Sequence, residues 1–298
     1  MNAAMLSSSL RLAALLASLL SLLALPAYAG EGSFGWVYTL DLQPKGTLEF
    51  EQRLQINQGQ AKGHYDLWQA RTEVEYGVSE DFQIAGYLNT SRVSANQNYG
   101  DGSTSGWLVP SSAGSSPYSR TRVDGVSLEG IWRFTNPVID PVGVGFYLEA
   151  TTGAVKDELE SRLLLQSNFL DDRLVVAANL QLSVERVKFN TPDIGKESMA
   201  DLLLGMSYRV ANNWTAGMEY RFHNDFEGYS FNQQTQRAHF IGPNMHYATK
   251  DWWVTAAWRY QLKGQSHCWA PGEAECSNGR VWDSHSRNEV MFKFGRPL

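Results

Sequence analysis

The feature that most constrains the fold of this chain is an alternation of polar and apolar residues that recurs along most of its length. In RTEVEY (residues 71–76), charged residues occupy the odd positions, and Thr, Val and Tyr occupy the even ones. A period of two residues is typical of a β-strand with one polar and one apolar face. The chain should therefore fold mainly into strands, and the surroundings of each face have to be inferred from the remaining sequence.

The length of the alternating segments favours a membrane. After Gly46 we expect strands at approximately 47–56, 65–76, 82–91, 121–134, 143–152, 158–169, 174–186, 198–210, 214–222, 236–247, 252–262 and 286–294. Most of them have 9 to 13 residues, whereas strands in soluble sheets average about five or six. A tilted strand needs about 9–11 residues to cross a bilayer.

The connections between these strands alternate in length. Short links fall at 77–81, 135–142, 170–173, 211–213 and 248–251, and mostly longer ones at 57–64, 92–120, 153–157, 187–197, 223–235 and 263–285. Short turns at one end and longer loops at the other are typical of outer-membrane barrels. We therefore expect an all-β fold, a transmembrane antiparallel up-and-down β-barrel of about 12 strands with short periplasmic turns and longer extracellular loops.

The N-terminus carries an export signal. Arg11 precedes an apolar run from Leu12 to Leu25, and Ala27-Tyr28-Ala29 follows as a small-x-small cleavage site. This pattern predicts a signal peptide over residues 1–29, with an uncleaved anchor as the alternative. With the barrel, it predicts the outer membrane of a Gram-negative bacterium as the location.

The rest of the chain divides into two parts. Residues 46–298 should form a single barrel domain, and residues 30–45 an N-terminal periplasmic or mouth segment. The aromatic residues Phe34, Trp36 and Tyr38 of that segment could form an extra edge segment or tuck into the periplasmic mouth.

Composition and charge limit the partners. The formal net charge is −6, and no Lys/Arg run appears, so no nucleic acid is expected. No segment after the signal peptide approaches 18 apolar residues, which excludes a membrane-spanning helix. The expected partners are outer-membrane lipid and lipopolysaccharide, the barrel-assembly machinery during biogenesis, and a small polar solute. Cys268 and Cys276 lie close together in an exported protein, and this predicts a local disulfide.

The two rows of each strand should face different surroundings, lipid for the apolar row and the lumen for the polar row. The expected lumen-lining residues are Glu49, Glu51, Arg53, Arg71, Glu73, Glu75, Glu129, Arg133, Glu149, Asp201, Arg209, Glu219, Arg221, Arg259, Arg287 and Glu289. In 236–247, Phe240 and Met245 differ in parity, so we expect a β-bulge at Gly242-Pro243 that returns both to the lipid face.

Aromatic residues of the apolar row flank nearly every short turn, and they predict a girdle at the membrane boundary. They are Tyr76, Phe82, Phe134, Phe169, Tyr208, Trp214, Tyr247 and Trp252. The alternative, aromatic residues that close the edge of a soluble β-sandwich, explains only one or two of these pairs.

Three sequence blocks resemble a known family. FGWVYTLDLQPKGTLEFEQRL, RTEVEYGVSEDFQIAGYLN and GPNMHYATKDWWVTAAW are similar to an uncharacterised family of Gram-negative outer-membrane β-barrel proteins, a domain of unknown function. The blocks cover about a third of the mature chain and contain no catalytic motif. The resemblance implies a fold and a location, and no reaction. The chain departs from the usual aromatic C-terminus by continuing to Leu298.

The charged lumen leaves two functions open. It could select solutes, as a narrow channel or transporter for small polar solutes. It could instead be closed by ion pairs, as a non-conducting structural or surface-interaction barrel. The segment from Ser91 to Arg120 is favoured as a surface loop over an inward constriction built from Tyr99, Trp107 and Tyr118.

A third hypothesis, less favoured than the other two, is that the protein is an outer-membrane lipid-modifying enzyme. No G-x-S-x-G elbow is present, and the spacing of Glu73 and Glu75 is explained by lumen lining. We therefore expect no enzyme, no catalytic residue and no cofactor. His267, Cys268, Cys276 and His285 have the composition of a zinc site but lack the C-x-x-C spacing, so no metal site is expected.

Overall fold

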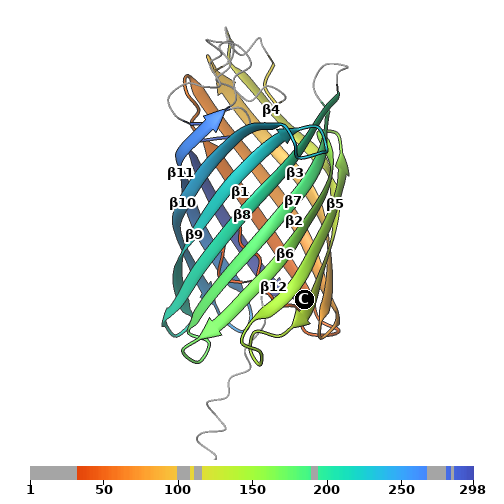
Figure 1. Cartoon of the computed structure of the whole chain (residues 1–298), viewed down its shortest axis with the longest axis vertical. Helices are drawn as coiled ribbons and strands as arrows, with labels where there is room; N and C mark the ends of the chain where they lie inside the picture. Colours follow the sequence, from red (N-terminus) through yellow and green to blue (C-terminus); the bar gives the residue numbers. More distant parts are fainter. Residues whose placement is uncertain (1–31, 99–107, 111–115, 189–193, 267–279, 283–284) are drawn as a thin grey trace, which may run out of the picture.

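The computed structural model describes residues 32–98, 108–110, 116–188, 194–266, 280–282 and 285–298 of the chain. Twelve strands close into one barrel, and each pairs antiparallel with its neighbours in chain order (Figure 1). β1 pairs with β12 to close the sheet. This confirms the all-β up-and-down barrel. No helix long and apolar enough to cross a membrane occurs among the described residues.

The strands and their bounds are β1 (Leu48–Gln58), β2 (His64–Ser79), β3 (Phe82–Asn96), β4 (Tyr118–Thr135), β5 (Gly143–Gly153), β6 (Lys156–Phe169), β7 (Leu174–Lys188), β8 (Ile194–Ala211), β9 (Trp214–Glu227), β10 (Gln234–Ala248), β11 (Trp253–Ser266) and β12 (Asn288–Pro297). We call the end with the connections β2–β3, β4–β5, β6–β7, β8–β9 and β10–β11 the short-turn end. The opposite end is the long-loop end.

Several strands are longer at the long-loop end than the sequence indicated. β4 starts at Tyr118 and β8 at Ile194, so both have 18 residues. Pairing of β3 with β4 continues to Ala95 and Tyr118. Both faces of these outer extensions are polar or mixed, so the two-residue alternation that marks a strand fades while the backbone ladder continues.

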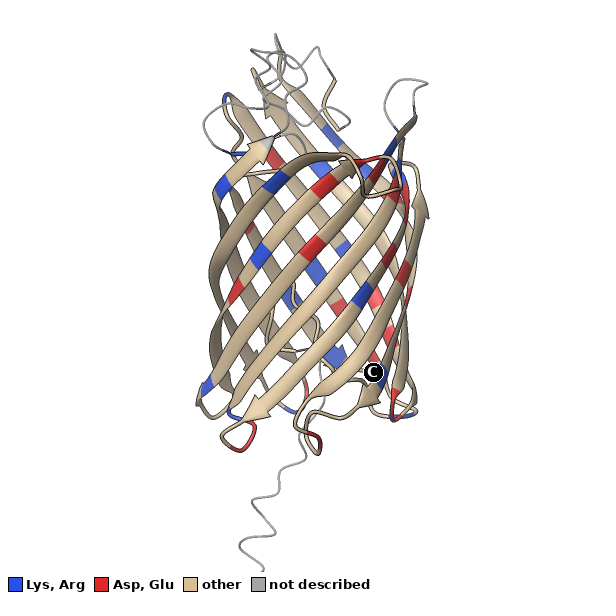
Figure 2. Ribbon diagram, in the orientation of Figure 1, with Lys and Arg blue, Asp and Glu red and all other residues tan. Residues whose placement is uncertain are grey.

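The two faces of the wall separate as expected from the alternation. Outward Leu204 and Trp258 are 41% and 43% exposed, while inward Glu51 and Glu73 are almost fully buried. Acidic and basic residues lie at many levels along the strands and around the short turns (Figure 2). A closed barrel leaves no unpaired sheet edge.

The expected bulge at Gly242-Pro243 is wrong. Both residues pair in register with β9, and the irregularity against β11 lies between His239 and Phe240. Phe240 is fully buried in the lumen, where it packs with Val281, and the outward Met245 is half exposed. Phe240 and Met245 differ in parity because Phe240 belongs to an apolar patch inside the barrel. Strand β10 therefore needs no extra residue at Gly242-Pro243.

The signal peptide expected at 1–29 and the Cys268–Cys276 disulfide fall on residues outside the described part, so both stay predictions.

Candidate functional site: the lumen

The β1–β2 hairpin places like charges opposite each other on the lumen wall. Its register pairs Glu49 with Glu75, Glu51 with Glu73, and Arg53 with Arg71. Like charges directly across a strand pair are destabilising. The wall here needs partners from elsewhere in the barrel.

One partner lies on the same strand, where Arg53 Nε is 3.6 Å from a carboxylate oxygen of Glu51, and others come from strands that are distant in the sequence. The Lys293 ammonium of β12 lies 3.8 Å from a carboxylate oxygen of Glu51. The Trp253 indole donates to Glu49 over 2.9 Å, and the Arg71 guanidinium lies 3.7 Å from Glu149 on β5. Sequence reasoning did not place Lys293 in the lumen. Two signals could have done so: Lys293 shares its odd position with the inward Glu289, and it is flanked by the outward Phe292 and Phe294.

Most of the expected lumen residues point inward and are buried or half-buried, namely Glu49, Glu51, Arg53, Arg71, Glu73, Glu75, Glu129, Glu149, Asp201, Glu219, Arg221, Arg259 and Glu289. Arg133 also faces inward, at the short-turn rim, where it donates to the Leu40 carbonyl over 3.2 Å and pairs with Asp81 over 3.1 Å. Two arginines require correction. Arg209 is exposed at the end of β8, and Arg287 is exposed just before β12. Both lie at strand ends, where parity no longer fixes a side chain inside the barrel.

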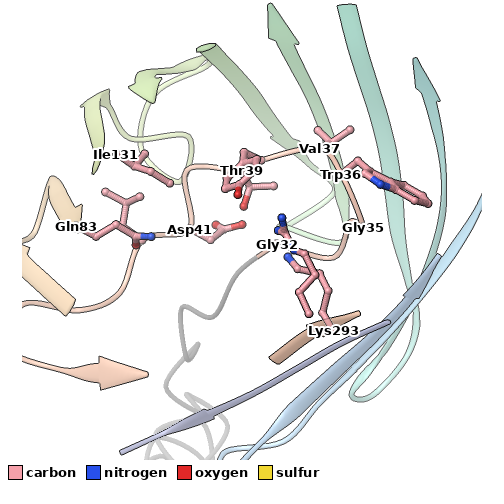
Figure 3. Close-up of a pocket in the computed structure, with 12 residues that line it drawn as sticks. Gly32, Gly35, Trp36, Val37, Thr39, Asp41, Gln83, Ile131 and Lys293 are labelled. Atoms are coloured by element: carbon pink, nitrogen blue, oxygen red, sulfur yellow. The ribbon is translucent and has the colours of Figure 1, made fainter. Parts of the chain in front are cut away.

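Residues 32–45, here called the lumenal segment, lie inside the barrel in its short-turn half (Figure 1). They form no strand, and they run along the inner wall from β3 past β6 and β7 to β9. Phe34 and Leu40 are fully buried. In Figure 3 this segment passes the side chains of Gln83 and Lys293 on the wall.

Wall side chains satisfy the backbone of the lumenal segment. The Glu219 carboxylate accepts the N–H groups of Gly35, Trp36 and Val37 at 2.7, 2.8 and 3.2 Å. Asn179 accepts the Tyr38 N–H over 2.7 Å and donates to the Tyr38 carbonyl over 2.9 Å. A buried backbone group without a partner is costly, so these bonds are what allows an irregular segment inside a barrel.

Two glutamines of the wall continue the pattern toward β1. Gln166 accepts the Leu40 N–H over 2.6 Å, and Gln83 accepts the Gln43 N–H over 2.8 Å. The Gln43 side chain in turn donates to Glu75 over 3.3 Å. Part of the acid-rich wall is therefore bonded by the lumenal segment itself.

The aromatic side chains of the segment meet the arginines of the wall. The Arg259 guanidinium lies 4.1 Å from the centre of the Trp36 ring, and that of Arg162 lies 4.7 Å from the Tyr38 ring. The Tyr38 hydroxyl donates to Glu129 over 3.3 Å. Cation–π contacts of this kind contribute about 0.5–2 kcal/mol each.

Glycines of the wall leave space for the segment. A Cβ at Gly205 would lie 2.6 Å from the Phe34 ring, and one at Gly145 would collide with Leu40. The lumenal segment therefore occupies space beside these glycines that the side chain of any larger wall residue would fill.

Described parts of two connections fold inward in the long-loop half. Leu108 and Val109 are buried in a cluster with Tyr65 and Val155, against which Tyr118 packs. Within Ser91 to Arg120, these residues pack inward, which differs from the expected surface loop; Tyr99 and Trp107 lie outside the described residues. Trp282 from the β11–β12 connection is also buried.

Between the lumenal segment and these loops lies a polar cavity of about 340 Å³. Seven Asp or Glu residues and five Lys or Arg residues line it, together with His223 and His285: Asp124, Glu149, Glu158, Glu185, Glu197, Asp225 and Glu289, with Arg53, Arg71, Lys156, Arg221 and Arg259. Its volume is in the range of small-molecule sites, about 300–1,000 Å³. The cavity can hold a small polar solute or several waters.

The family can now be given. Residues 26–297 match the model of a protein family described as a family of unknown function (DUF6662). The chain belongs to the DUF6662 family. No curated protein matches the sequence.

Solved structures share the fold of this DUF6662 chain. An outer membrane channel from Pseudomonas putida F1 aligns over 93% of this chain and 100% of its own, with a TM-score of 0.57 and 12% identity. The β-domain of the Bordetella autotransporter BrkA aligns over 85% and 100%, with a TM-score of 0.52 and 10% identity. At such identities the likeness shows the barrel fold alone.

The outside of the DUF6662 barrel carries aromatic residues near its short turns. Phe134, Phe169 and Trp214 are 66%, 50% and 43% exposed. Neighbouring rings pack together, with Phe82 on Trp132 at 4.5 Å and Trp214 on Tyr247 at 4.7 Å between ring centres. The remaining girdle candidates, Tyr76, Tyr208 and Trp252, also lie on this outer face near the short turns.

Proposed function

We propose that this chain is an outer-membrane channel for small polar solutes, with a preference for cations, and that its lumenal segment holds it closed. The observation that carries the proposal is the polar cavity of about 340 Å³, whose lining has two more Asp and Glu residues than Lys and Arg residues (7 − 5), with its two histidines counted as neutral. A pore lined by one excess sign of charge concentrates ions of the opposite sign.

The closure is built so that it can be removed. The lumenal segment belongs to no strand, and its backbone bonds go to the side chains of Glu219, Asn179, Gln166 and Gln83. Its departure would leave the wall ladder from β1 to β12 unchanged. Water could then satisfy the same side chains, because the lumen would be wet.

The proposed location is the outer membrane of a Gram-negative bacterium. The apolar outer face, the aromatic residues near the short turns and the signal peptide expected at 1–29 support it. In this orientation the short-turn end faces the periplasm, and lipid and lipopolysaccharide surround the wall. Barrel-assembly machinery would insert the chain, and a transport function needs no catalytic residue.

A non-conducting barrel is the second candidate. The contacts of Trp36 and Tyr38 with Arg259 and Arg162 favour it, because they fill the short-turn half with paired charges and rings. In that case the lumenal segment is a permanent part of the core.

Conductance separates the two candidates. We would compare the intact mature chain with a variant that lacks residues 32–45, each refolded and inserted into planar bilayers under a KCl gradient. The intact chain should conduct rarely. The shortened chain should conduct steadily, with a reversal potential that indicates cation preference.

A second variant guards against misfolding of the deletion. Gly205→Leu keeps the full length of the chain, but its side chain would fill the space that Phe34 occupies and displace the lumenal segment. This variant should raise the open probability of the channel. Val210→Leu is the matched control, since Val210 is exposed on the outside of the same strand. If both lumen variants migrate as folded barrels and pass no current, the channel is refuted and the closed barrel stands.

A further inference from the structure

We propose that His223, Asp225 and His285 bind a divalent transition-metal ion, with Zn²⁺ as the best fit, on the wall of the lumenal cavity. All three residues line this cavity. The site does not rest on the channel proposal, because it needs only the folded barrel, and the cation preference proposed above refers to the metal-free lumen.

The three ligands converge on one point. The Nε2 atom of His223 lies 2.7 Å from Oδ2 of Asp225, and the Nε2 atom of His285 lies 3.2 Å from the same oxygen. One ligand atom from each residue lies within 4.8 Å of those of the other two. Zinc ligands lie about 2.0–2.2 Å from the metal, so a cation fits at the centre after small side-chain movements.

The backbone brings these ligands together from two directions. His223 and Asp225 are two residues apart on β9, so both side chains project from the same inner face. His285 comes from the inward-folded connection before β12, where its carbonyl accepts a hydrogen bond from Gln60 over 3.1 Å. The two histidine rings meet with their centres 4.4 Å apart.

The carboxylate of Asp201 orients His223. Nδ1 of His223 lies 2.8 Å from Oδ1 of Asp201, and the Asp201 side chain is fully buried. Asp201 also accepts from Arg221 Nε at 2.5 Å and from the Asn224 N–H at 3.2 Å. Because an ionised carboxylate can only accept, we assign the proton of this contact to Nδ1 of His223. Arg221 Nη2 lies 2.8 Å from the same nitrogen.

This assignment turns Nε2 of His223 into the ligand atom. A carboxylate on the far nitrogen of a metal-binding histidine fixes its tautomer and raises its basicity. Two imidazole nitrogens and one carboxylate oxygen suit Zn²⁺ and its late first-row neighbours better than Mg²⁺ or Ca²⁺, which prefer oxygen ligands.

The site keeps an open side. Three protein ligands leave a fourth tetrahedral position, and all three ligand residues line the polar cavity. Water or the donor atom of a small solute could occupy that position. The sequence did not indicate the site, because His285 is distant from His223 in the chain and only the inward fold of the connection joins them.

Metal titration tests the proposal. The mature chain, refolded in detergent without a polyhistidine tag and treated with EDTA, is titrated with ZnCl₂ by calorimetry. We expect one Zn²⁺ per chain. His285→Ala should weaken the affinity at least about 10-fold, and Asp201→Asn, which leaves all three ligands in place, by about 10- to 100-fold.

The matched control is His246→Ala. His246 also lies on the inner face, and its Nδ1 meets the Thr255 hydroxyl over 2.7 Å. Among the described residues it belongs to no cluster of three or more His, Cys, Asp or Glu side chains. This variant should bind Zn²⁺ like the parent chain. Absence of binding to the parent chain would overturn the proposal, as would full affinity in His285→Ala. His285 lies outside the strands, so its variant should still fold, which migration on a gel can verify.

Discussion

In the short-turn half of the barrel the lumen is occupied by residues 32–45, whereas in the long-loop half the same twelve strands surround a cavity of about 340 Å³. Both halves have the same alternation of inward polar and outward apolar residues. The difference lies in how much chain the wall receives. Gly205 and Gly145 provide space, and Asn179 and Gln166 provide backbone partners, where the lumenal segment passes. In the long-loop half, Gln261 binds the backbone of Val281 in the same way.

The comparison teaches that alternation builds a barrel without deciding whether its lumen is open. The same charged row lines a hollow half and a filled half. Closure depends on a separate segment of chain, and the wall carries the amides and glycines that receive it.

The largest effect should follow loss of a buried arginine at the boundary of the filled half. The Arg259 side chain is 6% exposed, pairs with Glu289 and covers Trp36. Arg259→Ala leaves that carboxylate buried without its partner, which typically costs about 3–5 kcal/mol. The free energy of unfolding, measured by denaturant titration in detergent, should fall by that amount.

Arg71 provides the matched comparison, because it also lines the cavity but its side chain is more exposed. The side chain is 21% exposed and lies 3.7 Å from Glu149. Water in the cavity can solvate the Glu149 carboxylate that is left behind, so Arg71→Ala should cost about 1 kcal/mol. Equal losses for the two variants would mean that the exposure of the ion pair does not set the cost.

A somewhat smaller effect is expected on the outer face. Leu204 points to lipid, seven residues from the short-turn end of β8 (211 − 204). At about 3.3 Å per residue this is close to the bilayer midplane for a tilted strand. Leu204→Arg should lower the free energy of unfolding in vesicles by about 2–4 kcal/mol, and Val210→Arg near the rim by about 0–1 kcal/mol. The reverse order would indicate that β8 is placed wrongly in the membrane.

The sequence predicted the wall well and its contents poorly. Alternation gave all twelve strands and the inward row from Glu49 to Glu289, because a two-residue period is a local signal. The position of residues 32–45 could not be derived, since Phe34, Trp36 and Tyr38 read equally as an edge segment. The wall residues that contact this segment are single positions such as Gly205 and Asn179. No pattern in the neighbouring sequence shows that these residues contact a distant segment.

Chain ends and loops were the other source of error. Parity assigned Arg209 and Arg287 to the lumen, but it loses its meaning where a strand ends. The burial of Leu108 and Phe240 reflects long-range packing inside the barrel, which leaves no periodic signal in the sequence.

The smallest effect concerns pH and the filled half. Burial raises the pKa of Asp41, while hydrogen bonds from Thr39 and Gln166 and the charge of Arg133 partly lower it. Because the pKa of Asp41 is raised when the lumenal segment lies inside the barrel, protonation of Asp41 stabilises this bound state. The stabilisation is fully present below the free pKa of about 3.9. This stabilisation is lost as the pH rises through the higher value.

Hydrogen exchange can measure this dependence. After correction for intrinsic rates, the amides of Gly35 to Leu40 should be better protected at pH 4 than at pH 7. Asp41→Asn should remove the difference. Protection that increases with pH in the parent chain would contradict the assignment.

The central claim is that residues 32–45 sit inside the lumen, and a cross-link tests it most directly. A Cβ on Gly35 would lie 3.4 Å from Cβ of Met291 on β12, close to the separation of about 3.5–4.5 Å in a disulfide. We would combine Gly35→Cys with Met291→Cys and with Ala257→Gly, which removes a Cβ at 2.7 Å. Cys268→Ser and Cys276→Ser remove the native thiols. Mass spectrometry of the folded, oxidised barrel should find nearly all chains cross-linked between positions 35 and 291, and none when Gly35→Cys is paired with Lys263→Cys near the long-loop end. Free thiols at both positions in the folded barrel would contradict the account.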